Sequence, residues 1–412
     1  MATPRTSTYT KGSGQGIFAG IASSAIAAQL LAADGCWTWF SDSRAVWVGG
    51  TLYFTAIATN GTVWAHRWTV AGGLQRFQLS ATGMEVDDHN NGAVLALPGG
   101  RLLWMYCKHP DTHQRYRVWD GIGAFTSGAS WTSETMLAAT EPTYSNLAYL
   151  STPGRTVAFW RSGTSGDRVT NMRTTADLSS WAAESPLITG TGARPYVKFV
   201  SDGADTIHFL LTNCHPDEGT ASVYHCKAVF DAAGARDIKS SAGVSLGATV
   251  QPTDCTLIYS PTTDNTWVWD ITIGPDGHPW ALFVRFVTPT DHRLMFARWN
   301  GSAWTTPTQI AALGTYLYAA QSAYSSGGAF DPLDARRVYA SITVSGRREL
   351  QEFRTADNGA AWAKHRDLTS GSTDDSIRPI RVTGSDGTVR VLWLRGAYST
   401  YLDNATAVWG AG

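Results

Sequence analysis

The sequence predicts an all-β fold, a seven-bladed β-propeller with four-stranded antiparallel blades. Two runs of alternating apolar residues joined by a glycine-containing turn recur along the chain, at intervals of roughly 50 residues. The segments between these runs lack the periodicity of an α-helix, which argues against an α/β fold. Hairpins repeated at this spacing are typical of blades arranged radially.

Each repeat begins with a β-hairpin, because an alternating run buries one face of a strand and glycine permits the tight turn. The sixth hairpin is the least regular, and the double interval between Gly277 and Gly387 indicates its place. The seven hairpins span residues 46–57, 94–106, 148–160, 197–211, 271–284, 323–344 and 381–394.

The segments after the hairpins supply the outer strands, and two of them carry an Asp-box. In this motif an acid caps a tight turn while a tryptophan packs between blades, so we expect a structural role. Blade packing is likewise the expected role of most of the 18 tryptophans. The full motif comprises Thr355, Asp357, Gly359 and Trp362, and a degenerate copy comprises Thr175, Asp177 and Trp181.

Composition indicates one globular domain, which we expect to span residues 34–412. Apolar residues make up 43% of the chain and charged residues 16%, enough for a large core. Lys and Arg total 32 against 33 for Asp and Glu, so no basic excess exists to bind a nucleic-acid backbone. The five cysteines are odd in number and scattered, unlike a disulfide framework.

Residues 1–33 form an N-terminal extension in this prediction. The stretch 16–33 is apolar and rich in small residues, so it resembles either an export signal or a short helix capping the propeller. No other segment is long and apolar enough to span a bilayer. We expect a monomer without membrane or nucleic-acid partners, secreted or associated with a virion.

Polar residues precede the first strand of several hairpins, where a propeller gathers strand starts at one rim. The second strand of each hairpin returns to that rim, so its end adds further residues. We therefore expect His89, His109, Tyr144, Arg161 and Tyr196 to form one cluster. Further expected substrate-binding residues at this rim are Arg44, Asn90, Arg194 and Arg378.

Three kinds of carbohydrate chemistry differ in the side chains that they need at this rim. Ordinary glycoside hydrolysis needs two facing carboxylates, and the acids near the rim show no obvious pair. A sialidase uses a tyrosine nucleophile and clustered arginines. A uronate lyase needs a carboxylate partner, a base and an acid, which arginine, histidine and tyrosine supply. The rim acids are Asp42, Asp87, Asp88 and Glu141, and the rim arginines are Arg44, Arg161, Arg194 and Arg378.

Five ordered motifs resemble the BNR-repeat propellers that include the ulvan lyases. The resemblance implies β-elimination at a uronic acid in a sulfated, rhamnose-containing polysaccharide such as ulvan. Departures from the family pattern are Asn91 and Gly92 after DDHN, and the sequence TNCHP. The five motifs span residues 34–61, 87–109, 142–150, 159–163 and 194–216.

The resemblance also implies roles for the residues of the cluster. Arg161 would neutralise the substrate carboxylate. His89 would be the base and Tyr144 the acid, or the two would be exchanged. His109 and Tyr196 would orient the substrate. A sialidase-like hydrolase and a non-catalytic glycan-binding propeller, such as one displayed on a bacteriophage, are the alternatives.

A metal site is a further hypothesis for the fourth hairpin and its surroundings. Imidazole and thiolate are ligands that zinc prefers, and the resemblance makes a structural zinc or calcium plausible there. The alternative is that strand histidines are hydrogen-bonded within a blade. Catalysis is expected to need no cofactor. The candidate ligands are His208, Cys214, His215 and His225, with Cys226 beside them.

Overall fold

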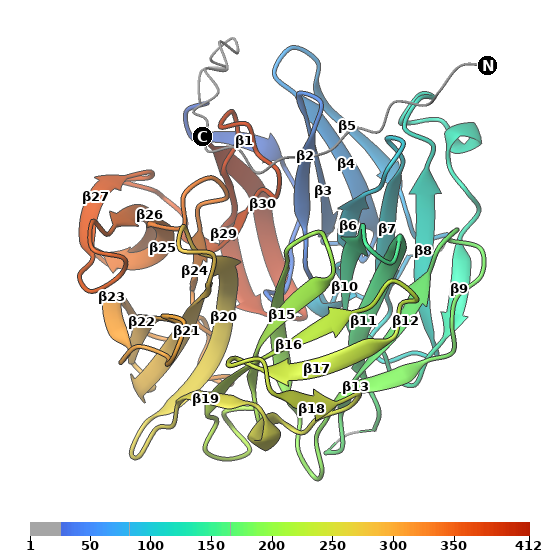
Figure 1. The fold of residues 1–412 in the computed structure, drawn as a ribbon. Helices are drawn as coiled ribbons and strands as arrows, with labels where there is room; N and C mark the ends of the chain where they lie inside the picture. The colour runs from blue at the N-terminus through green and yellow to red at the C-terminus, as the bar shows by residue number, and fades with distance from the viewer. Residues whose placement is uncertain (1–25, 82, 165) are drawn as a thin grey trace, which may run out of the picture.

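The computed structural model describes residues 26–412 except 82 and 165. Seven antiparallel sheets are arranged around a centre, with β2, β6, β10, β20 and β24 among the innermost strands (Figure 1). The predicted seven-bladed propeller is therefore confirmed. Each predicted hairpin forms the first two strands of one blade.

The first three blades each contain four strands in chain order, from the centre outward. They comprise β2 (Ala45–Val48), β3 (Thr51–Ile57), β4 (Val63–Thr69) and β5 (Gly73–Gln78); β6 (Ala93–Ala96), β7 (Leu102–Cys107), β8 (His113–Trp119) and β9 (Thr135–Ala138); β10 (Thr143–Leu150), β11 (Arg155–Ser162), β12 (Val169–Thr175) and β13 (Ser185–Thr189).

The fourth blade is the largest in the described part of the chain, because its sheet has six strands. Two of its strands, β17 and β19, pair with different stretches of β16. The sheet comprises β14 (Tyr196–Ser201), β15 (Thr206–Thr212), β16 (Val223–Phe230), β17 (Arg236–Ser240), β18 (Ser245–Gly247) and β19 (Thr256–Tyr259).

The last three blades return to four strands each. Short 3-10 helices lie between some strands, namely η1 (Asp88–Asn90), η2 (Gly128–Ser130) and η3 (Pro252–Asp254). The strands comprise β20 (Asn265–Ile273), β21 (Pro279–Thr288), β22 (Asp291–Arg298) and β23 (Thr308–Gly314); β24 (Gly328–Phe330), β25 (Arg337–Val344), β26 (Arg347–Arg354) and β27 (Ala363–Asp367); β28 (Ser376–Arg381), β29 (Val391–Thr400) and β30 (Asp403–Ala411) with β1.

The last blade closes the ring with a strand from the beginning of the chain. β1 (Gln29–Ala32) pairs antiparallel with β30, and it lies beside β30 in Figure 1. The sheet therefore begins at Gln29, inside the segment 1–33 that the sequence assigned to an extension. The rest of the predicted export signal or capping helix, residues 16–25, lies outside the described residues.

Many of the tryptophans are buried in the core. Trp37, Trp104, Trp160, Trp267, Trp280 and Trp393 are among the largest fully buried side chains. In the full Asp-box, Asp357 Oδ1 accepts hydrogen bonds from Thr355 Oγ1 at 2.7 Å and from the Ala361 amide at 2.9 Å. The Trp362 ring packs against Phe296 of the preceding blade, with centroids 5.2 Å apart. The Asp-box therefore has the expected structural geometry.

Replacing Gly359 by alanine is expected to destabilise the protein by about 3 kcal/mol. Gly359 has a φ of +89°, and an added Cβ would lie 1.9 Å from Phe296 Cε1. The matched control is Gly277→Ala, where φ is +75° but no atom lies within 4 Å, so only backbone strain of about 1 kcal/mol applies. Thermal unfolding of both variants checks this, and equal losses would contradict the packing argument.

A central cavity of about 450 Å³ lies inside the ring of innermost strands. It reaches hairpin turns at Gly203 and Gly384, and charged side chains line it, including Asp42, Arg44 and Asp270. The hairpin turns lie at one end of the channel, so the starts of the innermost strands lie at its opposite end.

Among residues 26–412, with 82 and 165 left out, no helix is both long and apolar enough for a bilayer crossing.

Candidate functional site

The DDHN segment forms the short helix η1 just before β6. Asp87 is its N-cap, and its Oδ1 accepts a hydrogen bond from the His89 backbone amide at 2.9 Å. Capping of this kind is favoured because it satisfies a backbone N–H that lacks a partner within the helix. It also brings the His89 ring back over the capping carboxylate.

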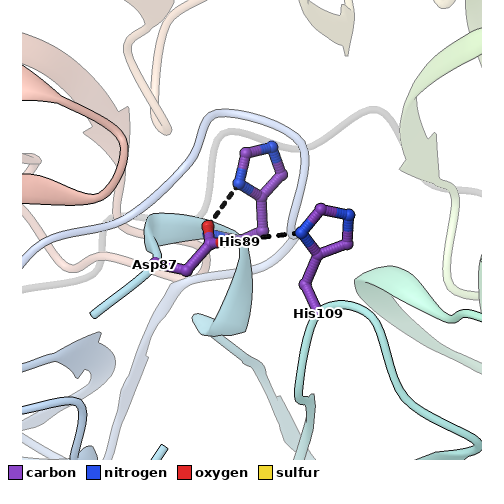
Figure 2. Close-up of side chains that lie close together, drawn as sticks. All are labelled: Asp87, His89 and His109. Carbon is purple, nitrogen blue, oxygen red and sulfur yellow. Dashed lines mark hydrogen bonds and ion pairs between the residues drawn. The ribbon is translucent and has the colours of Figure 1, made fainter. Parts of the chain in front are cut away.

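Asp87 contacts two imidazoles at once (Figure 2). Its Oδ1 lies 2.5 Å from His89 Nδ1, and its Oδ2 lies 3.1 Å from His109 Nδ1. The two rings stack with centroids 4.8 Å apart. Because both Nδ1 atoms face the same carboxylate, the Nε2 atom of each ring points away from it.

Asn90 fixes the backbone that carries His109. Its Oδ1 accepts a hydrogen bond from the His109 amide at 2.7 Å, and its Nδ2 donates to the Glu85 carbonyl at 3.1 Å. Asn90 is fully buried. The structure therefore gives this residue a positioning contact to His109, where the sequence predicted contact with substrate.

Arg161 lies between two tyrosines of adjacent blades. Its Nη1 donates a hydrogen bond of 2.7 Å to Tyr196 Oη, and its guanidinium lies 4.6 Å from the centroid of the Tyr144 ring. Tyr144 has a φ of +65°, at a register shift between Thr143 and Asn146. This local bulge sets the direction of the Tyr144 side chain.

The tyrosine and histidine groups form one cluster. The Tyr144 ring lies 5.3 Å from His89 and 5.9 Å from Tyr196, between ring centroids. The structure thus brings together His89, His109, Tyr144, Arg161 and Tyr196, which the blade topology had placed at one rim. Phe40 packs against both tyrosines, with ring centroids 5.1 Å from Tyr144 and 4.8 Å from Tyr196.

Tyr401 is a member of the site that sequence reasoning missed. It lies in the turn between β29 and β30, and its ring meets His89 edge-on at 5.1 Å. Its carbonyl accepts a hydrogen bond from the Asp88 amide at 2.9 Å. The turn between the second and third strands of a blade lies at the same rim as the start of the first strand. This topology could have placed Tyr401 at the rim from the sequence alone.

Arg378 supports the site from below. Its Nη1 lies 2.5 Å from Asp88 Oδ2, and its Nη2 donates to Tyr398 Oη at 2.8 Å. The Arg378 side chain is completely buried. Because its charge is paired with Asp88 beneath η1, it does not reach the surface where a substrate would bind, contrary to the sequence-based expectation.

Two other arginines predicted to bind substrate lie outside the cluster. Arg44 lines the central cavity, where Nη2 pairs with Asp42 Oδ1 at 3.1 Å. Arg194 is part-exposed near the start of β14, and its Nε pairs with Glu218 Oε1 at 2.5 Å. Neither arginine contacts the cluster: Arg44 points into the central cavity, and Arg194 pairs with Glu218.

The four proposed metal ligands of the fourth blade do not come together. His208 Nδ1 lies 3.0 Å from His225 Nε2, and His225 Nδ1 lies 2.8 Å from Ser241 Oγ, so these rings are bonded inside the blade. His215 turns away and packs against Tyr196, with ring centroids 5.5 Å apart. Burial lowers the pKa of His215 to about 3, so this ring is neutral beside the cluster.

Asp87, His89 and His109 are instead the group that could hold a metal ion. Within the described ranges it is the one set of three such side chains whose ligand atoms all lie within 4.8 Å of one another. Two imidazoles and a carboxylate are donors that suit zinc and other transition metals. The same atoms are also satisfied by the hydrogen bonds to Asp87.

The two histidines of this group have different protonation states. Burial opposes a charged ring at His89, but Asp87 and Asp88 outweigh it and raise the pKa of His89 to about 10. Burial lowers the pKa of His109, and the neighbouring His89 adds to this effect. At neutral pH, His89 is therefore an imidazolium, and His109 is a neutral imidazole that donates Nδ1–H to Asp87.

On the aromatic side of the cluster, Tyr144 keeps its phenol proton and Arg161 is permanently charged. Burial raises the pKa of Tyr144 well above 10, and Tyr196 adds to this shift, so Tyr144 is a neutral phenol. Burial opposes the charge of Arg161, but Tyr196 and Tyr144 raise its pKa. The cluster thus offers two cations, one neutral imidazole and phenol donors.

Comparison with solved structures shows the same fold in polysaccharide lyases. A PL25 ulvan lyase bound to -[GlcA(1-4)Rha3S]- matches with a TM-score of 0.72 over 94% of this chain and 96% of its own, at 13% identity. The polysaccharide lyase Uly1 matches with a TM-score of 0.60 over 93% and 97%, also at 13% identity. At this identity the likeness concerns the fold.

No curated protein matches the chain by sequence. A family model does: that of the BNR repeat-containing proteins matches residues 51–311, which is more than half of the chain. On this match the chain belongs to the BNR repeat-containing family.

Proposed function

We propose that this protein is a polysaccharide lyase that cleaves a uronic-acid-containing polymer by β-elimination. The observation that carries the proposal is the buried cation Arg161. Arg161 is 7% exposed, its Nε has no hydrogen-bond partner, and no acidic side chain of the described residues forms an ion pair with it. A buried guanidinium without a counterion is costly unless a ligand supplies one, and a sugar carboxylate fits this role.

The elimination requires three events at one sugar ring. The cation at Arg161 draws charge from the C5 carboxylate, which acidifies the C5 proton. A base removes that proton, its bonding electrons form the C4–C5 double bond, and the C4–O4 bond breaks. An acid then protonates the departing O4, so that a new chain end and an unsaturated uronate are produced.

The protonation states suggest which residue is the base. His89 was the sequence-based candidate, but a ring with a pKa of about 10 carries its proton at neutral pH and cannot accept another. His109 is neutral, and Asp87 orients it through Nδ1, as a carboxylate orients the histidine of a catalytic triad. We therefore assign the base to His109, the acid to Tyr144, and a second stabilising charge to His89.

The pH profile of kcat/KM tests this assignment. Activity is expected to rise through acidic pH, with an inflection below 6.5 as His109 loses its proton, and to fall near pH 10 as His89 loses its charge. If His89 were the base, activity would instead increase toward pH 10. A profile of that second shape would contradict the assignment while leaving the elimination reaction intact.

The reaction itself is tested by incubating the folded protein with a panel of uronate polysaccharides, including ulvan. The conjugated double bond of the product absorbs in the ultraviolet, so a rising absorbance together with shorter chains is the expected result. New reducing ends without the chromophore would identify a hydrolase of sialidase type. Binding without any cleavage would identify a glycan-binding propeller.

The substrate class and the location belong to the same proposal. The fold is shared with ulvan lyases, one of them bound to a glucuronate and sulfated rhamnose oligosaccharide, and this supports an anionic polysaccharide as substrate. A polysaccharide substrate of this class is met outside the cell, so we place the protein there, secreted or on a virion. No metal or organic cofactor takes part in the steps above.

A further inference from the structure

The fourth blade contains a junction at which two strands share one edge of β16. β19 pairs with the first part of that edge, where Thr256 lies opposite His225. β17 pairs with the remainder, beginning with Ser240 opposite Cys226. The Ser241 amide donates a hydrogen bond to Thr256 Oγ1 at 2.9 Å, which joins the two strands where they meet.

Two cysteines lie side by side at this junction. Cys255 immediately precedes Thr256, so the antiparallel register, in which Thr256 lies opposite His225, brings Cys255 next to Cys226. The Cys255 thiol donates to the Gln251 carbonyl at 3.5 Å, and its closeness raises the pKa of the Cys226 thiol. Both belong to the same apolar cluster. A disulfide requires Cα atoms roughly 4.4–6.8 Å apart, and neighbouring antiparallel strands place facing residues about 4.5–5.5 Å apart.

We propose that Cys226 and Cys255 form an intramolecular disulfide when the protein meets an oxidising environment. The oxidant is a low-molecular-weight disulfide such as oxidised glutathione. A thiolate of the pair attacks a glutathione sulfur and releases one glutathione; the second thiol then displaces the other. Two thiols thereby lose two electrons and two protons, and two molecules of reduced glutathione are formed.

Accessibility decides which thiol reacts first. Cys226 is completely buried, and its contact with Cys255 and its burial raise its pKa well above the usual value. Cys255 is 7% exposed and is the entry point for the oxidant. The resulting bond would tie η3 and the start of β19 to β16, closing a loop that contains β17 and β18.

The other cysteines provide internal controls. Cys36 and Cys107 are completely buried in other blades. Cys214 is 7% exposed, as Cys255 is, but lies beyond the end of β15 and beside Gly219. Replacing Cys214 therefore removes an equally exposed thiol without touching the pair.

Peptide mapping tests the proposal directly. The purified full chain is incubated with oxidised glutathione, its remaining thiols are alkylated in denaturant, and it is digested with trypsin and a glutamate-specific protease. Trypsin alone leaves Cys214 and Cys226 in one peptide, whereas cleavage at Glu218 separates them. A Cys226–Cys255 cross-link, with the other three thiols alkylated, is expected. Five alkylated thiols, or a cross-link to Cys214, would overturn the proposal.

A second measurement does not depend on recovering the peptide. Reductant is expected to lower the thermal midpoint of the oxidised wild type and of Cys214→Ser by several degrees, because the cross-link restrains the unfolded chain. The thermal midpoint of Cys255→Ser should not change when reductant is added, even if that midpoint differs from the wild-type value. An equal response of Cys255→Ser and wild type would also overturn the proposal. Neither measurement depends on lyase activity.

Discussion

Arg161→Lys is expected to lower kcat for the uronate polymer by about 10² to 10³-fold. Lysine keeps the positive charge but loses the planar fork that holds a carboxylate through two hydrogen bonds. It also loses the hydrogen bond from Nη1 to Tyr196 Oη and the stacking over Tyr144. Initial rates of chromophore formation over a range of substrate concentrations measure the effect.

The matched control for this variant is Arg173→Lys. Arg173 lies on β12 of the same blade, but its Nη2 donates to the Ala138 carbonyl at 3.0 Å, away from the cluster. This variant is expected to retain wild-type kinetics. If Arg161→Lys also kept them while remaining folded, the role of Arg161 in neutralising the substrate carboxylate would have to be abandoned.

Asp87→Asn is expected to reduce kcat/KM by about 10² to 10⁴-fold, since one change disturbs both imidazoles. An asparagine amide has one oxygen acceptor in place of the two carboxylate oxygens, so it cannot accept hydrogen bonds from both His89 Nδ1 and His109 Nδ1. The tautomer of His109 is then no longer fixed. The pKa of His89 should also fall from about 10, because the nearest negative charge is removed. The high-pH limb of activity should therefore move to lower pH.

The shift of the high-pH limb of activity distinguishes a catalytic effect from a structural one, because misfolding would lower the rate without moving this limb. Asp237→Asn serves as control, because Asp237 lies on β17 and contacts Lys239 and Ser245 at the outer edge of another blade. An Asp87→Asn enzyme with reduced rate but an unmoved limb would show that His89 does not determine that limb.

The fold could be predicted from the sequence because its signals are local. Alternating runs and turn glycines mark each hairpin independently, so even the irregular sixth hairpin was placed by the spacing of its neighbours. The clustering of His89, Tyr144 and Arg161 followed from the same topology, since strand starts and strand ends meet at one rim.

The remaining parts of the site depend on side-chain direction, which the repeat pattern does not contain. Arg378 has a φ of +50° beside a register shift, and this turns its side chain into the interior toward Asp88. Tyr401 was not predicted because the end of β29 has the sequence RGAYST, which lacks the alternation of apolar and polar residues that marks a strand. The expected metal set failed to assemble because His215 follows the end of β15 and turns toward Tyr196.

The pairing of β1 with β30 links the two ends of the chain to the chemistry. The blade that they complete also carries Arg378 and Tyr401, which hold η1 from below and from the side. Losing the outermost strand would bare the edge of β30 and loosen the support beneath His89. The short segment Gln29–Ala32 is therefore expected to influence the position of His89, although it lies at the far edge of that sheet.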